Sequence, residues 1–300
     1  MIEAATAQPP APPLAAEGCR LPAAAKPAAA AHPADLDAPF ELTHEQIESY
    51  KRDGFIKLKA VLSPETLARY AVHIREEVDK ADKTPLEDDP AYAAAFVQIP
   101  NLWKLNPGCR EFSFGKRLGR IAAELMQVDG VRIYHDQALF KGPGGGHTPW
   151  HCDQYYWPLG SDRTVTAWVP LVPVPEGRGP LQFAAGSHKH DLGRAVGIGS
   201  ESDRVVGEAV KKGGFEVVGG PYELGDVSFH SGWTFHRADE NTSDEWRNVM
   251  TVIYMDKDMV MTEPVNDNQR RDWRDWLPGV QPGGACAGPN NPLVWERGSA

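Results

Sequence analysis

The chain has 300 residues, 41% of them hydrophobic, which fits one or two globular domains with a substantial core. Its 41 acidic residues outnumber 31 basic ones, and the net charge of −10 argues against a nucleic-acid partner and a basic membrane-binding surface. Four dispersed cysteines without a CxxC pair argue against a disulfide framework and a structural zinc site.

The ends of the chain bear on targeting and order. No apolar run approaches the roughly 20 residues that a membrane-spanning helix needs, so we expect no membrane insertion. The start, MIEAATAQPPAPP, has neither a cationic segment nor an apolar segment, so we expect no secretion signal and a cytoplasmic location. Residues 1–39 are rich in Ala and Pro, which predicts a disordered tail, with organelle targeting as the less favoured alternative.

Helices are predicted in the first ordered part of the chain. Thr43 and Gln46 have the spacing of a capping box, and Gly54 should end the helix that they begin. Pro64 suits the first position of a second helix. The expected elements are a helix from Thr43 to Gly54, a short strand at 55–58, a helix from Pro64 to about 82 and a helix over 111–127.

The pattern changes to short β-prone runs from residue 131 onward. Gly- and Pro-rich turns separate them, and no helical pattern is recognised between them. The runs are VRIYHDQALFK, TVTAWVPLV, PLQFAAG, FEVVGG, GDVSFH and NVMTVIYMD. Such a series predicts an antiparallel sandwich or barrel. A last short helix is expected at 267–277.

Residues 147–159, HTPWHCDQYYWPL, combine coordinating and aromatic groups. His151 and Asp153 are two apart, and on an extended segment such residues point to the same side, so both can reach one metal ion. A third ligand must come from elsewhere in the chain, and the candidates are His188, His190, His230 and His236. Two imidazoles and one carboxylate leave the opposite side of an ion open, which is typical of non-haem Fe(II) oxygenases.

Arg247 follows His236 by eleven residues, inside an apolar run that predicts a strand. An unpaired charge in such a run is costly, so a buried functional partner is expected. The planar guanidinium binds a carboxylate through two hydrogen bonds, so a small dicarboxylate co-substrate would reach from Arg247 to the metal.

At this point the chain resembles the phytanoyl-CoA dioxygenase family of Fe(II)/2-oxoglutarate-dependent oxygenases. The segments that carry the resemblance are ESYKRDGFIKL, YHDQALFKGPGGG, HTPWHCD, TVTAWVPL, RGPLQFAAGSHKH and FHRADEN with the following WRN. They span roughly residues 43–255. The resemblance implies a mainly β fold with flanking helices, a cupin-like jelly-roll called the double-stranded β-helix. One domain over 40–300 would then comprise helical support at 40–128, the jelly-roll at 129–258 and a C-terminal helix and tail at 259–300.

The resemblance also implies roles for individual residues. Iron would be held by His151, Asp153 and His236. Arg247 would pair with the far carboxylate of 2-oxoglutarate, and the residues in positions that contact the same co-substrate are Lys141, Trp168 and Gln137. Ala238 departs from the family, in which a small polar residue often stands two positions after the distal histidine.

The predicted function is the oxidation, by default the hydroxylation, of an unactivated C–H bond in a small, partly apolar molecule. Fe(II), 2-oxoglutarate and O2 would be required, succinate and CO2 would be released, and ascorbate is a candidate reductant. Halogenation is disfavoured because Asp153 retains the carboxylate ligand. Two alternatives stay open: a cupin-like metalloenzyme that does not use 2-oxoglutarate, and a non-catalytic jelly-roll binding module.

The remaining candidate residues have simpler interpretations. His230 is expected in a structural or pocket role, and His147 at the rim of a loop. His135 and Asp136 are adjacent and should face opposite sides of a strand, so they do not form a ligand pair. Cys152 should point away from the metal.

Overall fold

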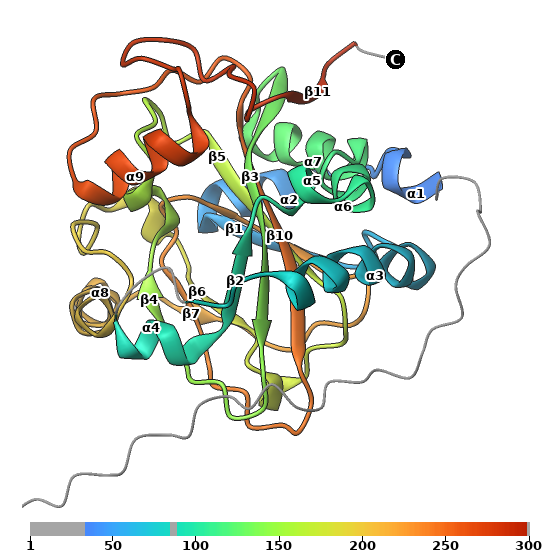
Figure 1. The fold of residues 1–300 in the computed structure, drawn as a ribbon. Helices are drawn as coiled ribbons and strands as arrows, with labels where there is room; N and C mark the ends of the chain where they lie inside the picture. Colours follow the sequence, from blue (N-terminus) through green and yellow to red (C-terminus); the bar gives the residue numbers. More distant parts are fainter. Residues whose placement is uncertain (1–33, 85–88, 299–300) are drawn as a thin grey trace, which may run out of the picture.

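The computed structural model describes residues 34–84 and 89–298, and two antiparallel sheets form its centre (Figure 1). The larger sheet has the strand order β1-β8-β5-β10-β3-β11, with β2 also paired to β3, and the smaller has the order β4-β9-β6-β7. The strands are β1 (Phe55–Leu58), β2 (Val97–Pro100), β3 (Gly130–Lys141), β4 (Thr148–His151), β5 (Thr164–Pro170), β6 (Leu181–Ala184), β7 (Val217–Val218), β8 (Val227–Ser231), β9 (His236–Ala238), β10 (Arg247–Asp256) and β11 (Leu293–Glu296). The predicted antiparallel two-sheet architecture is confirmed.

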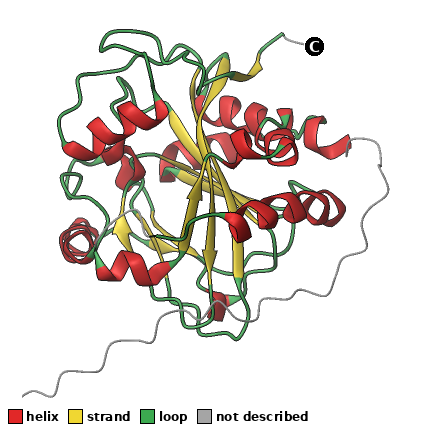
Figure 2. Cartoon of the chain, viewed as in Figure 1, coloured by secondary structure: helices red, strands yellow, loops and turns green. Residues whose placement is uncertain are grey.

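Most of the helices cover the outer face of the larger sheet, opposite the smaller sheet (Figures 1 and 2). The helices are α1 (Ala34–Asp37), α2 (His44–Asp53), α3 (Pro64–Lys80), α4 (Pro90–Ala95), α5 (Leu102–Leu105), α6 (Pro107–Ser113), α7 (Lys116–Met126), α8 (Ser200–Gly213) and α9 (Asp267–Trp276). The apolar faces of α1, α2, α3, α5, α6 and α7 join the larger sheet in one core, which includes Ile74, Leu118 and Val252. Helices α4 and α8 contact β4 instead, and α9 contacts the turn that follows it. None of the helices in the described ranges is long and apolar enough to cross a bilayer.

The predicted helix boundaries hold where a capping residue marks them. The Thr43 side chain accepts from the Gln46 amide, and the Gln46 side chain accepts from the Thr43 amide, which completes the capping box of α2. Gly54 ends this helix with a φ of 82°. The second helix begins at Pro64 behind the Ser63 cap, and α9 follows the expected range near the C-terminus.

The start of order lies earlier than the predicted boundary at residue 40. Residues 1–33 of the predicted tail are outside the described residues, but α1 is packed onto the domain. Asp35 accepts from the Ser63 amide and the Thr66 hydroxyl, and Leu36 is fully buried. The burial of Leu36 and the hydrogen bonds of Asp35 offset the entropy lost when this segment becomes ordered. The composition of the segment does not reveal these contacts.

Two further expectations need correction. The helix expected over 111–127 is divided into α6 and α7, and Gly115 at the break lies under Leu36, whose Cδ1 would be only 2.6 Å from a Cβ there. Helix α8 also lies between β6 and β7, where only strands were expected. It packs mainly against β4, the strand that ends at His151.

Three neighbouring strands of the larger sheet set the geometry of the interior. In the register of β3, β10 and β5, Gln137 lies opposite Thr251, and Thr251 lies opposite Trp168. Two residues further along β10, Ile253 lies opposite His135 of β3 and opposite Thr166 of β5. In the other direction Arg247 pairs with Lys141. Because every second residue faces the same side, these pairs form successive rows on one face of the sheet.

Gly54 and Gly214 provide a matched test of the packing around the end of α2. Both have positive φ, but a Cβ at Gly214 meets nothing within 4 Å, whereas one at Gly54 would lie 2.6 Å from Thr234 Oγ1 and closer still to the His188 ring. We expect Gly214→Ala to lower the free energy of unfolding by about 1 kcal/mol and Gly54→Ala by about 3 kcal/mol. Urea denaturation measures both, and equal losses would contradict this account of the packing.

Candidate metal centre

The smaller sheet brings two histidines together across a strand pair. His151 ends β4, His236 begins β9, and the two are directly paired, with ring centroids 4.1 Å apart. Asp153 opens a short 3-10 turn immediately after β4. Residues that are far apart in the sequence therefore converge because β4 and β9 are neighbours in the sheet.

The three side chains have the spacing of ligands to one ion. Asp153 Oδ1 lies 3.6 Å from His151 Nε2 and 3.6 Å from His236 Nε2. Two donors about 2.1 Å from a shared metal lie about 3–4 Å apart. One ligand atom from each residue, all within 4.8 Å of one another, could hold a metal ion.

Both imidazoles are held in the tautomer that a metal requires. His151 Nδ1 is 2.8 Å from the Pro149 carbonyl oxygen, and His236 Nδ1 is 3.0 Å from that of Thr234. A carbonyl only accepts, so each Nδ1 carries the proton and each Nε2 keeps a free lone pair.

The protonation states also suit metal binding. Burial, with a smaller contribution from His236, lowers the pKa of His151 to about 3, and burial lowers that of His236 to about 4. Burial alone would raise the pKa of Asp153, but His236 and His230 beside it hold that pKa well below its usual range. At neutral pH the centre therefore presents two neutral imidazoles and one carboxylate, without having to release protons first.

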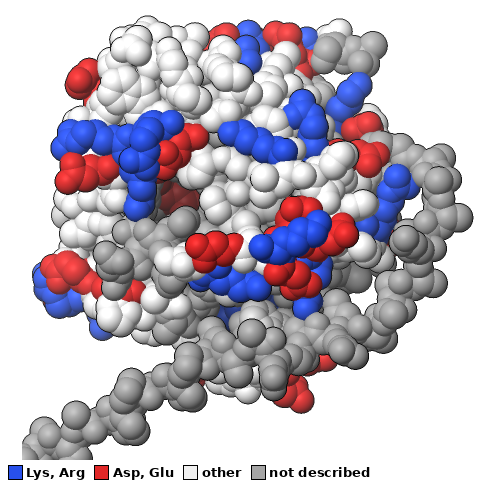
Figure 3. Space-filling view, in the orientation of Figure 1, with Lys and Arg blue, Asp and Glu red and all other residues white. Residues whose placement is uncertain are grey.

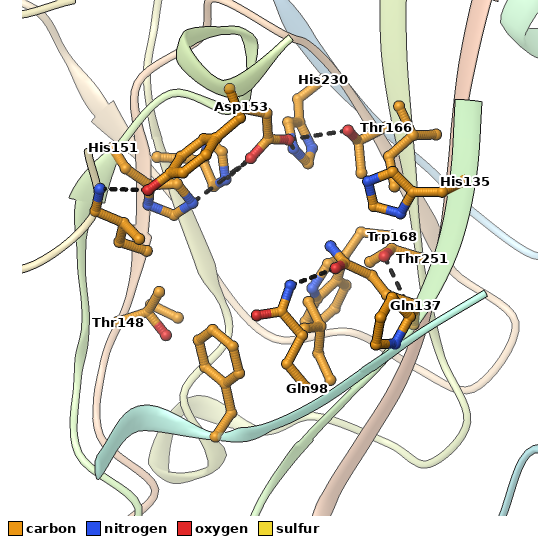
Figure 4. Close-up of a pocket in the computed structure, with 18 of the residues that line it drawn as sticks. Gln98, His135, Gln137, Thr148, His151, Asp153, Thr166, Trp168, His230 and Thr251 are labelled. Atoms are coloured by element: carbon orange, nitrogen blue, oxygen red, sulfur yellow. Dashed lines mark hydrogen bonds and ion pairs between the residues drawn. The ribbon is translucent and has the colours of Figure 1, made fainter. Parts of the chain in front are cut away.

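The outer oxygen of Asp153 is fixed by two side chains of the larger sheet. Thr166 Oγ1 donates to Asp153 Oδ2 at 3.0 Å, and His230 Nε2 lies 3.2 Å from the same oxygen (Figure 4). His230 is 1% exposed and paired with Thr166 across β8 and β5. Oδ1 is thus directed toward the histidines. The sequence predicts a structural or pocket role for His230, and no local pattern in it marks Thr166.

Arg247 lies at the far end of the same cavity. It is 2% exposed, its Nη1 donates to the Gly179 carbonyl at 2.7 Å, and its guanidinium lies 5.6 Å from the centroid of the Trp168 ring. Its Nε is buried without a hydrogen-bond partner among the described residues. Burial lowers the pKa of Arg247 to about 10, so the group stays charged at neutral pH. A buried cation with an unused donor fits an anionic ligand.

The other residues expected at the co-substrate divide into two groups. Trp168 and Gln137 line the cavity. Lys141 is fully buried and does not appear among the cavity-lining residues; its Nζ donates to the Gly146 and Asp239 carbonyls and to the Thr148 hydroxyl. These contacts hold the glycine-rich loop next to Arg247, with which Lys141 is paired.

The remaining histidine candidates lie away from the centre. His188 Nε2 is 3.3 Å from the Lys51 carbonyl, and His190 packs against Phe215. His147, half-exposed, lies 3.3 Å from Asp203. Cys152 is buried in a separate apolar cluster, away from the metal as expected.

The cavity that contains these groups is lined largely by aromatic and apolar side chains (Figure 4). This lining includes Tyr92, Phe96, Leu139, Tyr156, Trp157, Ile198, Ile253 and Trp276. Polar groups interrupt it at a few positions, among them Gln98 and His135. Such a wall excludes water and leaves orientation to a small number of polar contacts.

The fold and the site together define a class. A double-stranded β-helix that gathers two imidazoles and a carboxylate on one side, with a buried guanidinium in the same cavity, is the arrangement of a non-haem Fe(II)/2-oxoglutarate-dependent oxygenase.

Comparisons with known proteins agree. The sequence matches the profile of the family described as Phytanoyl-CoA dioxygenase (PhyH) over residues 50–249. A 2-aminoethylphosphonate dioxygenase from an uncultured bacterium is 24% identical over 222 residues, which cover 71% of this chain and 81% of that protein. Ectoine dioxygenase from Streptomyces avermitilis is 25% identical over 170 residues, 53% of this chain and 56% of that protein. The non-heme alpha ketoglutarate dependent carbocyclase SnoK from nogalamycin biosynthesis superposes with a TM-score of 0.71 at 26% identity, covering 86% of this chain and all of that chain.

The chain belongs to the phytanoyl-CoA dioxygenase family. Its predicted fold class and its predicted class of enzyme, a dioxygenase, are confirmed. The predicted metal and co-substrate agree with the description of SnoK as non-heme and alpha ketoglutarate dependent, and with the three side chains that could hold a metal ion.

Thr166 and Thr251 allow the role of the Asp153 contact to be measured. Both line the cavity, but only Thr166 donates to Asp153, whereas Thr251 donates to the Gln137 carbonyl. We expect Thr166→Val to weaken Fe(II) binding by about tenfold, because loss of a hydrogen bond to a metal ligand typically costs 10–100-fold in affinity. Thr251→Val should leave it unchanged. Titration with Fe(II) under anaerobic conditions, without 2-oxoglutarate, tests the pair, and equal affinities would contradict the assignment.

Proposed function

We propose that His151, Asp153 and His236 hold Fe(II), that Arg247 binds the distal carboxylate of 2-oxoglutarate, and that the enzyme hydroxylates a C–H bond of a small, partly apolar molecule. The observation that carries the proposal is the buried, unpartnered Nε of Arg247 in the cavity that also contains the three converging ligand atoms.

The spacing along the sheet supports this arrangement. Arg247 and Ile253 are six residues apart on β10, which corresponds to about 20 Å of extended strand. Ile253 pairs with Thr166, which contacts Asp153, so the metal centre lies at the opposite end of these rows from Arg247. The arginine side chain and a five-carbon dicarboxylate together suit this separation. Trp168 and Gln137 are proposed to flank the co-substrate between the two ends.

The reaction consumes one C–H bond, one O2 and one 2-oxoglutarate. Bound iron supplies the oxidising chemistry, by which one oxygen atom enters succinate, the other becomes the substrate hydroxyl, and CO2 leaves. The residues of the chain orient the reactants and exclude water. Arg247 orients the co-substrate, and Thr166 and His230 hold the Asp153 carboxylate in place. The aromatic wall keeps water from the reacting carbon.

A small-molecule substrate fits the cavity and the surface. On the face seen in Figure 3, acidic and basic side chains are intermixed, with no broad basic field for a polyanion. Two of the related dioxygenases are named for 2-aminoethylphosphonate and ectoine, both small molecules.

The proposal predicts succinate formation when the protein is incubated with Fe(II) and 2-oxoglutarate in air. His151→Ala should abolish iron binding and with it succinate, because only two ligands remain. Succinate is measured by chromatography, with the protein treated with a chelator as the blank. Iron binding without any succinate would favour a cupin-like enzyme that does not use 2-oxoglutarate, and absence of iron binding would favour a binding module.

Substitutions at Arg247 and Arg163 distinguish the binding of 2-oxoglutarate from the binding of the metal. Arg247→Leu should spare Fe(II) binding and raise the Kd of 2-oxoglutarate by at least tenfold, because it removes a charge-assisted contact to a carboxylate. Arg163→Leu removes an exposed arginine paired with Asp256 and should change neither value. Calorimetry with Mn(II) in place of iron measures both, and an unchanged Kd in Arg247→Leu would refute the assigned role.

A further inference from the structure

The end of the cavity opposite Arg247 is shaped by a β-bulge. The register of β3 and β10 shifts between Ile253 and Tyr254, so that Tyr134 has no partner on β10. Bulges redirect side chains next to active sites. Here Tyr134 is turned toward α9, where its hydroxyl donates to Asp272 Oδ2 at 3.1 Å, while its neighbour His135 points into the cavity (Figure 4).

His135 presents a hydrogen-bond acceptor to this end of the cavity. Its Nδ1 is 3.3 Å from the Asp136 carbonyl oxygen, so Nδ1 carries the proton and the lone pair is on Nε2, at the tip of the ring. Trp276 of α9 stacks on the same ring, with centroids 4.9 Å apart and planes 27° apart. Burial lowers the pKa of His135 to about 4, so the ring remains a neutral acceptor at neutral pH.

Asp272 adds a carboxylate to the same wall. It lines the cavity and is only 5% exposed. Among the described residues, the neutral donors Tyr134 and Trp276 hydrogen-bond to its side chain, and the Arg271 guanidinium, which also lines the cavity, favours its charged form. Burial raises the pKa of Asp272 to about 8, so the group is largely protonated at neutral pH, and a bound cation would favour its charged form.

Gln98 supplies a third acceptor. Its Nε2 donates to Gln137 Oε1, and its own Oε1 is buried without a hydrogen-bond partner among the described residues. The cavity therefore offers the acceptor atoms of Gln98, His135 and Asp272 between aromatic surfaces.

Helix α9 lies beyond residues 50–249, the segment that matches the family profile, whereas the proposed iron and co-substrate residues all lie within it.

We propose that this end of the cavity recognises a substrate by a hydrogen-bond-donating head group, a protonated amine or a hydroxyl, attached to an apolar body that packs against Trp276. Asp272 and His135 accept from the head group, and the body extends toward the metal centre. The inference rests on the proposed function, since it assigns the substrate of that same site.

The test compares four probes of similar size: 2-phenylethylamine, 2-phenylethanol, 3-phenylpropanoate and ethylbenzene. Binding to the full chain loaded with Zn(II) and 2-oxoglutarate is measured by ligand-observed NMR at millimolar concentration. We expect the amine and the alcohol to bind at least tenfold more tightly than the carboxylate and the hydrocarbon. Asp272→Asn should weaken the amine about tenfold and the alcohol less, whereas Asp267→Asn, an exposed carboxylate on the same helix, should change neither.

His135→Leu is the second variant, because it removes the other acceptor and leaves Asp272 in place. It should weaken both donor probes if the inference is correct. Failure of both donor probes to bind, equal binding of 3-phenylpropanoate, or donor binding that neither variant changes would overturn it. Succinate formed without substrate separates this failure from failure of the proposed function, since uncoupled turnover should be the same in wild type and in the exposed-site control Asp267→Asn.

Discussion

The pairing of β4 with β9 is the contact on which the site depends. It sets His151 opposite His236, and in each case the carbonyl two residues earlier accepts from Nδ1. Because the same backbone geometry orients both rings, the two Nε2 atoms converge without any further side chain to aim them. The carboxylate is the one ligand that needs outside support, and the larger sheet provides it through Thr166 and His230.

The two sheets thus contribute different parts of the site. The smaller sheet carries the two histidines of the proposed metal site, and Asp153 follows directly after β4. The larger sheet carries the rows that separate this site from Arg247 and fix its distance. A shift of the strand register in either sheet would change the distance between the three converging side chains and Arg247. The large core between the larger sheet and its helices resists such displacement, because close-packed interiors transmit strain instead of absorbing it.

Sequence reasoning succeeded where a residue type has a local physical meaning. A capping box, a proline at a helix start and an i, i+2 pair of ligands are recognisable without knowledge of the fold. It failed where the outcome depends on partners distant in the chain: the break at Gly115 is set by Leu36, and the bulge at Tyr134 by the register of β10. Asp272 belongs to a helix of mostly charged residues, DNQRRDWRDW, in which composition does not distinguish the one buried acid from its exposed neighbours.

Helix α9 is joined to the sandwich after the last long strand, and it packs on the short turn that begins with Asp153. Substitutions on this helix can change the wall of the cavity while the strands that position the proposed iron ligands keep their register. Substrate preference can therefore be altered through α9 without disturbing the residues proposed to hold iron. For the same reason α9 is the natural place to redesign the enzyme toward new compounds.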